Sequence, residues 1–278
     1  MKTYKFQQVD VFTNQPLHGN PLAVVHGADK WTVKQMQSFA HWTNLSETTF
    51  IMDPSHPDAD YKVRIFTPEN ELPFAGHPTL GTCHSWLSLG GLARDDDVIK
   101  QECGIGLIYI KREADRLAFR APPLSKTGPL NERDLTRLSA AFGLKKTDVV
   151  AHQWVANGPN WSVIMLNSAQ KVLELTPDLR ALSGDMVGVV GPYPDGGECD
   201  LEVRGFAVPA GINEDPVTGS LNAGLAMWLI HSGMMKDRYV VSQGTILGRR
   251  GRVYVEKRYN DIWVGGDVII CVDGQVRY

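Results

Sequence analysis

Short apolar runs that are typical of β-strands recur along the whole chain. Clusters of Gly, Pro, Asn and Asp, which favour turns, separate these runs from one another. The pattern predicts a protein that is rich in short strands. The predicted strands are residues 5–12, 22–25, 48–52, 61–66, 107–111 and 116–120 in the first half, and 161–165, 186–190, 201–208, 239–241, 252–256 and 261–268 in the second.

Four segments have helical patterns, and two of them are unusual. Residues 32–42 and 131–142 are ordinary candidates, because each begins with a residue that can cap a helix N-terminus. Residues 77–89 and 220–230 instead carry small or apolar side chains on every side. A helix that is apolar all round is buried all round. Among many short strands, such a helix predicts a sheet curled around a central helix.

Similar sequences precede the two apolar helices. The segment 64–77 and the segment 204–220 both contain R-x-F, a proline and then E-x-P-x-x-G followed by His or Ser. Gly76 and Gly219 in these strings are about half of the 278-residue chain apart. A repeat of this kind indicates two lobes of one design that arose by duplication. We expect the lobes to be residues 1–124 and 125–278, with the last dozen or so residues packing back on the first lobe as an alternative.

Composition narrows the class of protein. Hydrophobic residues are 43% of the chain and charged residues 21%, which is an ordinary globular balance. The net charge of −3 leaves no broad basic surface, so we expect no nucleic-acid partner. No apolar run approaches the roughly 18 residues that span a bilayer, so no membrane partner is expected. Four widely spaced cysteines without a CxxC pair are typical of reduced thiols, and the expected location is the cytoplasm.

The start of each apolar helix is a candidate anion site. A helix N-terminus presents unpaired backbone N–H groups and a partial positive charge. Gly76 and Gly219 would let a ligand approach this backbone without a side chain in the way. If the lobes are related by a pseudo-two-fold axis, the two helix starts would face each other across a cleft. The expected ligand is a small carboxylate.

Three residues near these turns are candidates for catalysis. Asp215 lies in the second turn where the first has Leu72, although it could also form an Asx turn before Pro216. Glu47 precedes an apolar strand, where desolvation can suit a carboxyl group to acid/base chemistry, although a surface glutamate is the alternative. His77 opens the first apolar helix, and it could donate to an anionic substrate or merely cap the helix.

Metal and cofactor motifs are missing from the sequence. No His, Cys or Asp cluster has metal-ligand spacing, so no metal site is expected. No GxGxxG follows a strand and no GxxxxGK[ST] loop occurs, so no nicotinamide or nucleotide cofactor is expected.

Four blocks of the sequence, residues 9–24, 45–50, 71–81 and 214–220, resemble the PhzF family, which is named for phenazine biosynthesis. The resemblance implies an α+β, diaminopimelate-epimerase-like fold with two similar lobes, each a curled mixed β-sheet around a central helix. It implies a cofactor-independent isomerase of the type that acts on trans-2,3-dihydro-3-hydroxyanthranilate, and it favours a homodimer.

The resemblance also implies roles for particular residues. Glu47 would be the catalytic acid/base, and His77 and Asp215 would hold the substrate. The neighbouring substrate contacts would be Asn20, Ser46, Gly76, Gly219 and Ser220.

The chemistry of the wider superfamily separates this chain from its epimerases. Those enzymes use a thiol at each helix start, and glycines stand at both positions here, so we expect a single-carboxylate isomerase. A dehydratase or lyase acting on a cyclic hydroxy acid, and a ligand-binding or interaction protein without turnover, remain alternatives. The physiological substrate and any part in phenazine biosynthesis stay open.

Overall fold

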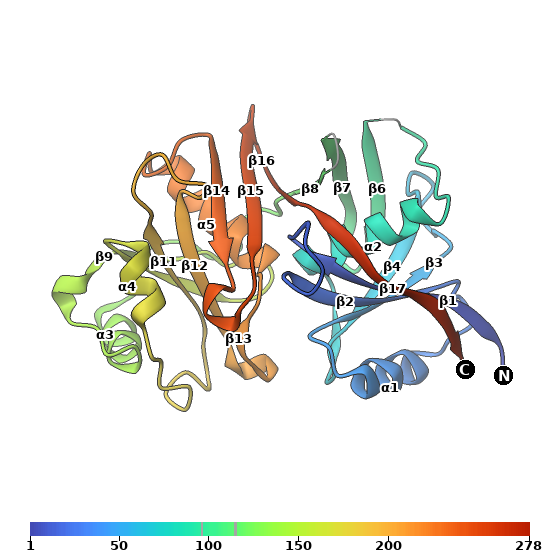
Figure 1. Ribbon diagram of the computed structural model, residues 1–278, viewed down its shortest axis with the longest axis horizontal. Coiled ribbons are helices and arrows are strands. Elements are labelled where there is room, and N and C mark those ends of the chain that lie inside the picture. The colour runs from blue at the N-terminus through green and yellow to red at the C-terminus, as the bar shows by residue number, and fades with distance from the viewer. Residues whose placement is uncertain (96, 114–115) are drawn as a thin grey trace. The chain divides into compact units, whose positions relative to one another are not determined.

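The computed structural model describes residues 1–95, 97–113 and 116–278, and the chain divides into two compact units. Unit 1 comprises Met1–Arg120 together with Gly265–Tyr278, and unit 2 comprises Ala121–Val264 (Figure 1). The division therefore lies between Arg120 and Ala121, whereas the sequence placed it between residues 124 and 125. The C-terminal segment belongs to unit 1 because its strand pairs with the first strand of the chain.

Unit 1 is a mixed sheet that surrounds a central helix. Its pairs β1–β2, β3–β4, β6–β7 and β7–β8 are antiparallel, whereas β2–β3 and β4–β6 are parallel. The elements are β1 (Thr3–Val11), β2 (Asn20–His26), α1 (Val33–Thr43), β3 (Thr48–Met52), β4 (Tyr61–Phe66), β5 (Glu71–Leu72), α2 (Gly76–Ser88), β6 (Val98–Cys103), β7 (Gly106–Glu113), β8 (Arg116–Arg120) and β17 (Val268–Arg277).

From β9 to β16, unit 2 repeats the order of elements from β1 to β8 and their pairings. The pairs β9–β10, β11–β12 and β14–β15 are antiparallel and the pairs β10–β11 and β12–β14 are parallel, as in the matching strands of unit 1. The elements are α3 (Glu132–Ala141), β9 (Val149–Trp154), β10 (Trp161–Leu166), α4 (Ala169–Glu174), β11 (Met186–Pro192), β12 (Leu201–Ala207), β13 (Ile212–Asp215), α5 (Gly219–His231), β14 (Arg238–Gln243), β15 (Gly251–Arg258) and β16 (Asp261–Gly266), with short 3-10 helices at Lys146–Asp148, Val208–Ala210 and Thr245–Leu247.

The helices α2 and α5 are central to their units, as their apolar sequences predict. In α5, Leu221 to Ala226 are all buried, and Gly76 to Cys83 are buried in α2. Glycines let both helices approach the strands closely. A Cβ atom added to Gly81 would lie 2.7 Å from Leu22 Cδ2, and one added to Gly224 would lie 2.2 Å from the carbonyl oxygen of Val155.

The remaining helices cover the other side of each sheet. In unit 1, α1 packs on an aromatic core that includes Trp31, Phe39 and Phe50. In unit 2, α3 and α4 bury Leu138 and Val172 in a core of their own. Each unit therefore has two hydrophobic layers, one on each face of its sheet.

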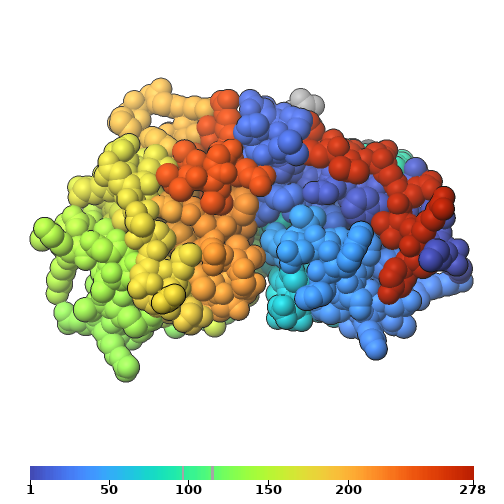
Figure 2. Space-filling view, turned by 60° about the horizontal axis from the view of Figure 1, so that its bottom comes forward, coloured from blue at the N-terminus to red at the C-terminus, as the bar shows by residue number. Residues whose placement is uncertain are grey.

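The sequence pattern missed several elements. Strand β6 alternates buried and partly buried positions, but its intervening residues Lys100 and Glu102 are charged, which hid the apolar period. The predicted strand 261–268 is in fact the whole of β16 and the first residue of β17. Strand β17 pairs with β1 from Val268 to Arg277, and Figure 2 shows these red C-terminal residues beside blue N-terminal ones. Among the described residues, no helix is long and apolar enough to cross a membrane.

Candidate active site

Glu47 and His77 lie together in unit 1. Glu47 immediately precedes β3, and His77 is the second residue of α2. His77 Nε2 lies 3.5 Å from Glu47 Oε2, and the side chains are only 4% and 13% exposed. The pair lies where the parallel strands β2 and β3 begin and the central helix starts. The sequence singled out both residues, and the structure brings them together.

Asn20 and Ser46 fix the orientation of the imidazole. Ser46 Oγ donates to Asn20 Oδ1, and Asn20 Nδ2 donates to His77 Nδ1, both at a long 3.4 Å. With this amide orientation His77 Nδ1 is an acceptor, so the ring proton of the neutral imidazole is on Nε2 and points toward Glu47. Asn20 is fully buried. The resemblance predicts Asn20 as a substrate contact, and in the structure its amide also contacts His77.

Burial controls the charge of His77. Desolvation lowers the pKa of His77 to about 3. At neutral pH the ring is a neutral hydrogen-bond donor beside a carboxyl group.

The first turns of α2 and α5 carry no side-chain caps. Ala75 and Thr218 occupy the N-cap positions, and neither side chain accepts a hydrogen bond from the helix backbone. The first residues of the helices, Gly76 and Gly219, are buried and have no side chain. Such helix starts are able to bind an anion.

Asp215 and Ser220 flank the start of α5 in unit 2. Asp215 is 8% exposed, and its Oδ2 atom accepts a 2.6 Å hydrogen bond from Thr218 Oγ1. Ser220 Oγ accepts from Trp161 Nε1 at 3.0 Å, and the Ser220 carbonyl accepts from Asn157 Nδ2 at 2.9 Å. Because Trp161 already donates to Ser220 Oγ, the serine hydroxyl hydrogen can point to another acceptor.

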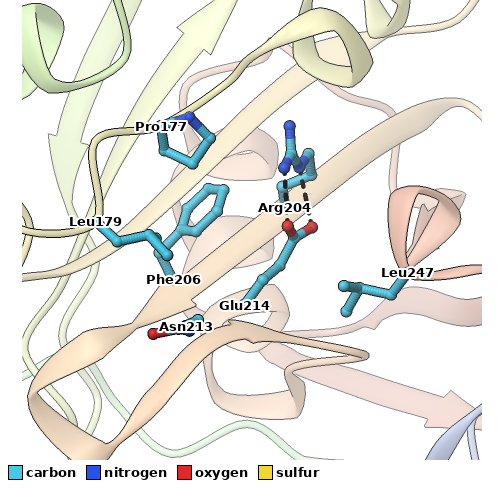
Figure 3. A pocket seen from close by; sticks show the side chains of 7 residues that line it. All are labelled: Pro177, Leu179, Arg204, Phe206, Asn213, Glu214 and Leu247. Carbon is cyan, nitrogen blue, oxygen red and sulfur yellow. Dashed lines mark hydrogen bonds and ion pairs between the residues drawn. The ribbon is translucent and has the colours of Figure 1, made fainter.

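The repeated R-x-F and E-x-P strings form a matched pair of ion pairs. Arg204 donates to both carboxylate oxygens of Glu214 at 2.9 and 2.8 Å, and Arg64 does the same with Glu71 at 2.7 and 2.6 Å. Figure 3 shows the unit 2 pair in a cavity of about 360 Å³, with Phe206 beside it. Each pair ties a strand to the turn that leads into the central helix. The sequence identified this repeat but not the contact within it.

The duplicated positions differ in their chemistry. Asp185 immediately precedes β11 as Glu47 precedes β3, but Arg137 donates to both of its oxygens at 2.5 and 2.8 Å. Asp185 is therefore held in a structural ion pair. Conversely, unit 2 has a carboxyl group where unit 1 has none, because Asp215 at the end of β13 corresponds to Leu72 at the end of β5. Unit 1 keeps the Glu47–His77 pair and unit 2 keeps Asp215.

The cysteine thiols do not take the place of Glu47, His77 or Asp215. The cysteines lie at positions 83, 103, 199 and 271, away from the first residues of α2 and α5. Burial raises the pKa of the Cys83 thiol to about 12, which keeps it protonated. Within residues 1–95, 97–113 and 116–278, no three His, Cys, Asp or Glu side chains are grouped to hold a metal ion.

Comparisons with known proteins agree with this fold. The family described as "Phenazine biosynthesis-like protein" matches residues 9–274. Antisense-enhancing sequence 1 of Schizosaccharomyces pombe is 35% identical, with 99% of each chain covered. The trans-2,3-dihydro-3-hydroxyanthranilate isomerase of Pseudomonas aeruginosa is 32% identical, over 98% of this chain and 99% of that protein.

A solved structure supports the same assignment. The phenazine biosynthesis protein of the PhzF family from Enterococcus faecalis superposes with a TM-score of 0.81 at 25% identity, and all of both chains is covered. The expected α+β, epimerase-like fold is confirmed. The chain therefore belongs to the phenazine biosynthesis-like, or PhzF, family of isomerases.

Proposed function

We propose that this protein is a cofactor-independent isomerase that moves a proton on a small cyclic amino or hydroxy carboxylic acid, with Glu47 as the acid/base. The observation that carries the proposal is the buried pair of Glu47 and a neutral His77 at the start of α2. A carboxyl group held beside a fixed donor and shielded from water is suited to proton transfer.

The proton moves within one substrate molecule. The Glu47 carboxylate takes a proton from an activated carbon, and the electrons of the broken C–H bond enter the conjugated system. The same carboxyl group returns a proton to another carbon, so the enzyme ends the cycle unchanged. His77 Nε2 lies 3.5 Å from Glu47 Oε2, and we propose that this separation shortens to a hydrogen bond that orients the carboxyl group during the reaction. A positioned acid/base typically contributes about 10²–10⁴-fold to the rate.

Backbone and hydroxyl donors would hold the substrate carboxylate and the negative charge that develops. In unit 1 these are the first turn of α2 at Gly76 and the hydroxyl of Ser46. In unit 2 they are the first turn of α5 at Gly219 and the hydroxyl of Ser220. We assign Asp215 the role of an acceptor for an amino or hydroxyl group of the substrate. Donors fixed before the reaction stabilise charge without reorganising.

The substrate class follows from the relatives and from these groups. The Pseudomonas aeruginosa relative is named for trans-2,3-dihydro-3-hydroxyanthranilate, which carries a carboxylate, an amino group and a hydroxyl group on a ring. The anion-binding helix starts and the acceptor Asp215 match these features. We propose a substrate of this kind for the present protein, together with a cytoplasmic location and a homodimeric state.

Proton NMR in D₂O tests the reaction. The wild-type protein and Glu47→Gln are incubated with dihydro-hydroxyanthranilate and a panel of cyclic amino and hydroxy acids. An isomer, or deuterium at a carbon, with the wild type but not with the variant supports the proposal. A product lighter by one water identifies a lyase instead. Tight binding without exchange on every compound points to a protein that binds and does not turn over.

A further inference from the structure

Gln243 connects four groups at the start of α5. It is the last residue of β14 and its side chain is fully buried. Its Oε1 atom accepts from Thr218 N at 3.0 Å and from Asn222 Nδ2 at 2.8 Å. Its Nε2 atom donates to Thr218 Oγ1 at 2.9 Å and to the Asp215 carbonyl at 3.1 Å. Two donors face the oxygen and two acceptors face the nitrogen, so the amide orientation is determined.

This orientation sets the direction of the next hydrogen bond. Thr218 Oγ1 accepts a hydrogen from Gln243, so its own hydrogen is directed to Asp215 Oδ2, 2.6 Å away. The chain of hydrogen bonds therefore ends on Asp215 as an acceptor. The side chains of Gln243, Thr218 and Asp215 are all at least nine-tenths buried. Hydrogen bonds to a carboxylate are strong in such a buried environment.

We propose that Gln243 and Thr218 are positioning residues, which hold Asp215 as a hydrogen-bond acceptor for the donor group of the substrate. This inference rests on the proposed function, because it assumes that Asp215 binds a donor group of the substrate. Gln243 acts through Thr218, and Thr218 acts through the carboxylate of Asp215. Neither residue needs to touch the substrate.

Unit 1 has a comparable contact at a different register, because Gln101 stands beside Tyr61 of β4 whereas Gln243 stands beside Val203 of β12. Gln101 in β6 is fully buried, and its Nε2 atom donates to Thr79 Oγ1 at 3.0 Å. The Thr79 hydroxyl donates to the Ala75 carbonyl at 2.9 Å, and the acidic position of unit 2 is Leu72 here. A buried glutamine that supports the first turn of the central helix is thus common to both units. Only in unit 2 does the supported hydroxyl bind a carboxylate.

Gln101→Leu in unit 1 controls for the stability that is lost when a buried glutamine is removed. The experiment measures Tm, and kcat and KM on the substrate found above, for the wild type and four variants. The variants are Thr218→Val, Thr218→Ser, Gln243→Leu and Gln101→Leu. Hydrogen bonds to charged groups are among the stronger ones, so kcat/KM should fall by about 10–100-fold in Thr218→Val and Gln243→Leu. Thr218→Ser should stay within about threefold of wild type. Gln101→Leu removes the comparable glutamine of unit 1 and should lose a similar amount of Tm to Gln243→Leu.

A double mutant separates positioning from general damage. If Thr218 acts through Asp215, Asp215→Asn combined with Thr218→Val should be no slower than Asp215→Asn alone. An additive loss in the double mutant, or an unchanged kcat/KM in Thr218→Val, would overturn the proposal.

A readout without substrate keeps this inference apart from the proposed function. The Thr218 hydroxyl proton should be protected from solvent exchange in the proton NMR spectrum of the wild type, and unprotected in Gln243→Leu. Equal exchange in both proteins would rule out the hydrogen-bond chain even in an active enzyme. A protected proton in a wild type that is inactive on every compound would reject the isomerase and retain the chain.

Discussion

His77 has its proton on an identified nitrogen, and a single neighbour is responsible. Asn20 Nδ2 donates to His77 Nδ1, which leaves Nε2–H facing Glu47. The acid/base group is therefore oriented by a residue that is itself fully buried. A histidine in the other tautomer would present a lone pair to the carboxylate.

Replacing Asn20 with Asp should reverse the tautomer. The new carboxylate would accept from Nδ1–H, so Nε2 would lose its hydrogen and would no longer support Glu47. We expect kcat/KM to fall by about 10²-fold, the size of a lost positioned donor, in steady-state assays. An Asn20→Asp protein with normal activity and a normal circular dichroism spectrum would contradict the assigned tautomer.

The burial of His77 predicts a pH-dependent stability. The pKa of His77 is lowered to about 3 in the folded protein, below the ordinary value of 6.5. Between these values the unfolded chain binds the proton and the folded protein does not, so His77 destabilises the fold as the pH falls. Urea unfolding of wild type and His77→Asn should show a free-energy difference that changes by about 1.4 kcal/mol per pH unit below pH 6.5. Parallel pH profiles for the two proteins would show that His77 titrates normally.

At the scale of elements, the central helices contain glycines that should tolerate an added side chain to different degrees. A Cβ on Gly81 would meet side-chain methyl groups, beginning with Leu22 at 2.7 Å, and these can shift. A Cβ on Gly224 would meet the Val155 carbonyl oxygen at 2.2 Å, which is backbone in unit 2. We expect Gly81→Ala to cost about 1–2 kcal/mol and Gly224→Ala about 3 kcal/mol or more in urea unfolding. Equal losses would mean that the helix of unit 2 can move away from its strands.

The two ion pairs should also differ in their contributions. The side chains of Arg204 and Glu214 are 3% and 10% exposed, whereas those of Arg64 and Glu71 are 23% and 38% exposed. Arg204→Met leaves a buried carboxylate without its partner and should cost about 3–5 kcal/mol. Arg64→Met should cost about 1 kcal/mol or less, because water can replace the guanidinium. Thermal unfolding of both variants measures this, and a larger loss for Arg64→Met would contradict the burial argument.

At the scale of the whole molecule, the sequence predicted the duplication and the buried helices because both leave local patterns. The E-x-P-x-x-G repeat and the all-apolar helix segments can be read without any contact being known. The pairing of β17 with β1 joins opposite ends of the chain, and the return of the C-terminal residues was expected only as an alternative because no local pattern identifies their partner strand. The same limit explains the site. Glu47, His77 and Asn20 could be selected one by one, but the Asn20–His77 contact could not, and neither Gln243 nor Thr218 stands out in the sequence.

The duplication also offers the sharpest control for the central claim, which is that Glu47 is the acid/base. Asp185 is its counterpart before β11, but it is bound by Arg137. Both Glu47→Gln and Asp185→Asn remove one negative charge from the same position of the repeated design.

The most direct measurement is the rate of deuterium entry into a substrate carbon in D₂O, for wild type, Glu47→Gln and Asp185→Asn side by side. Glu47→Gln should be slower by about 10²-fold or more with an unchanged Tm, whereas Asp185→Asn should keep its rate within about threefold and lose some stability. Equal rates for Glu47→Gln and wild type would contradict the account and remove Glu47 from the mechanism.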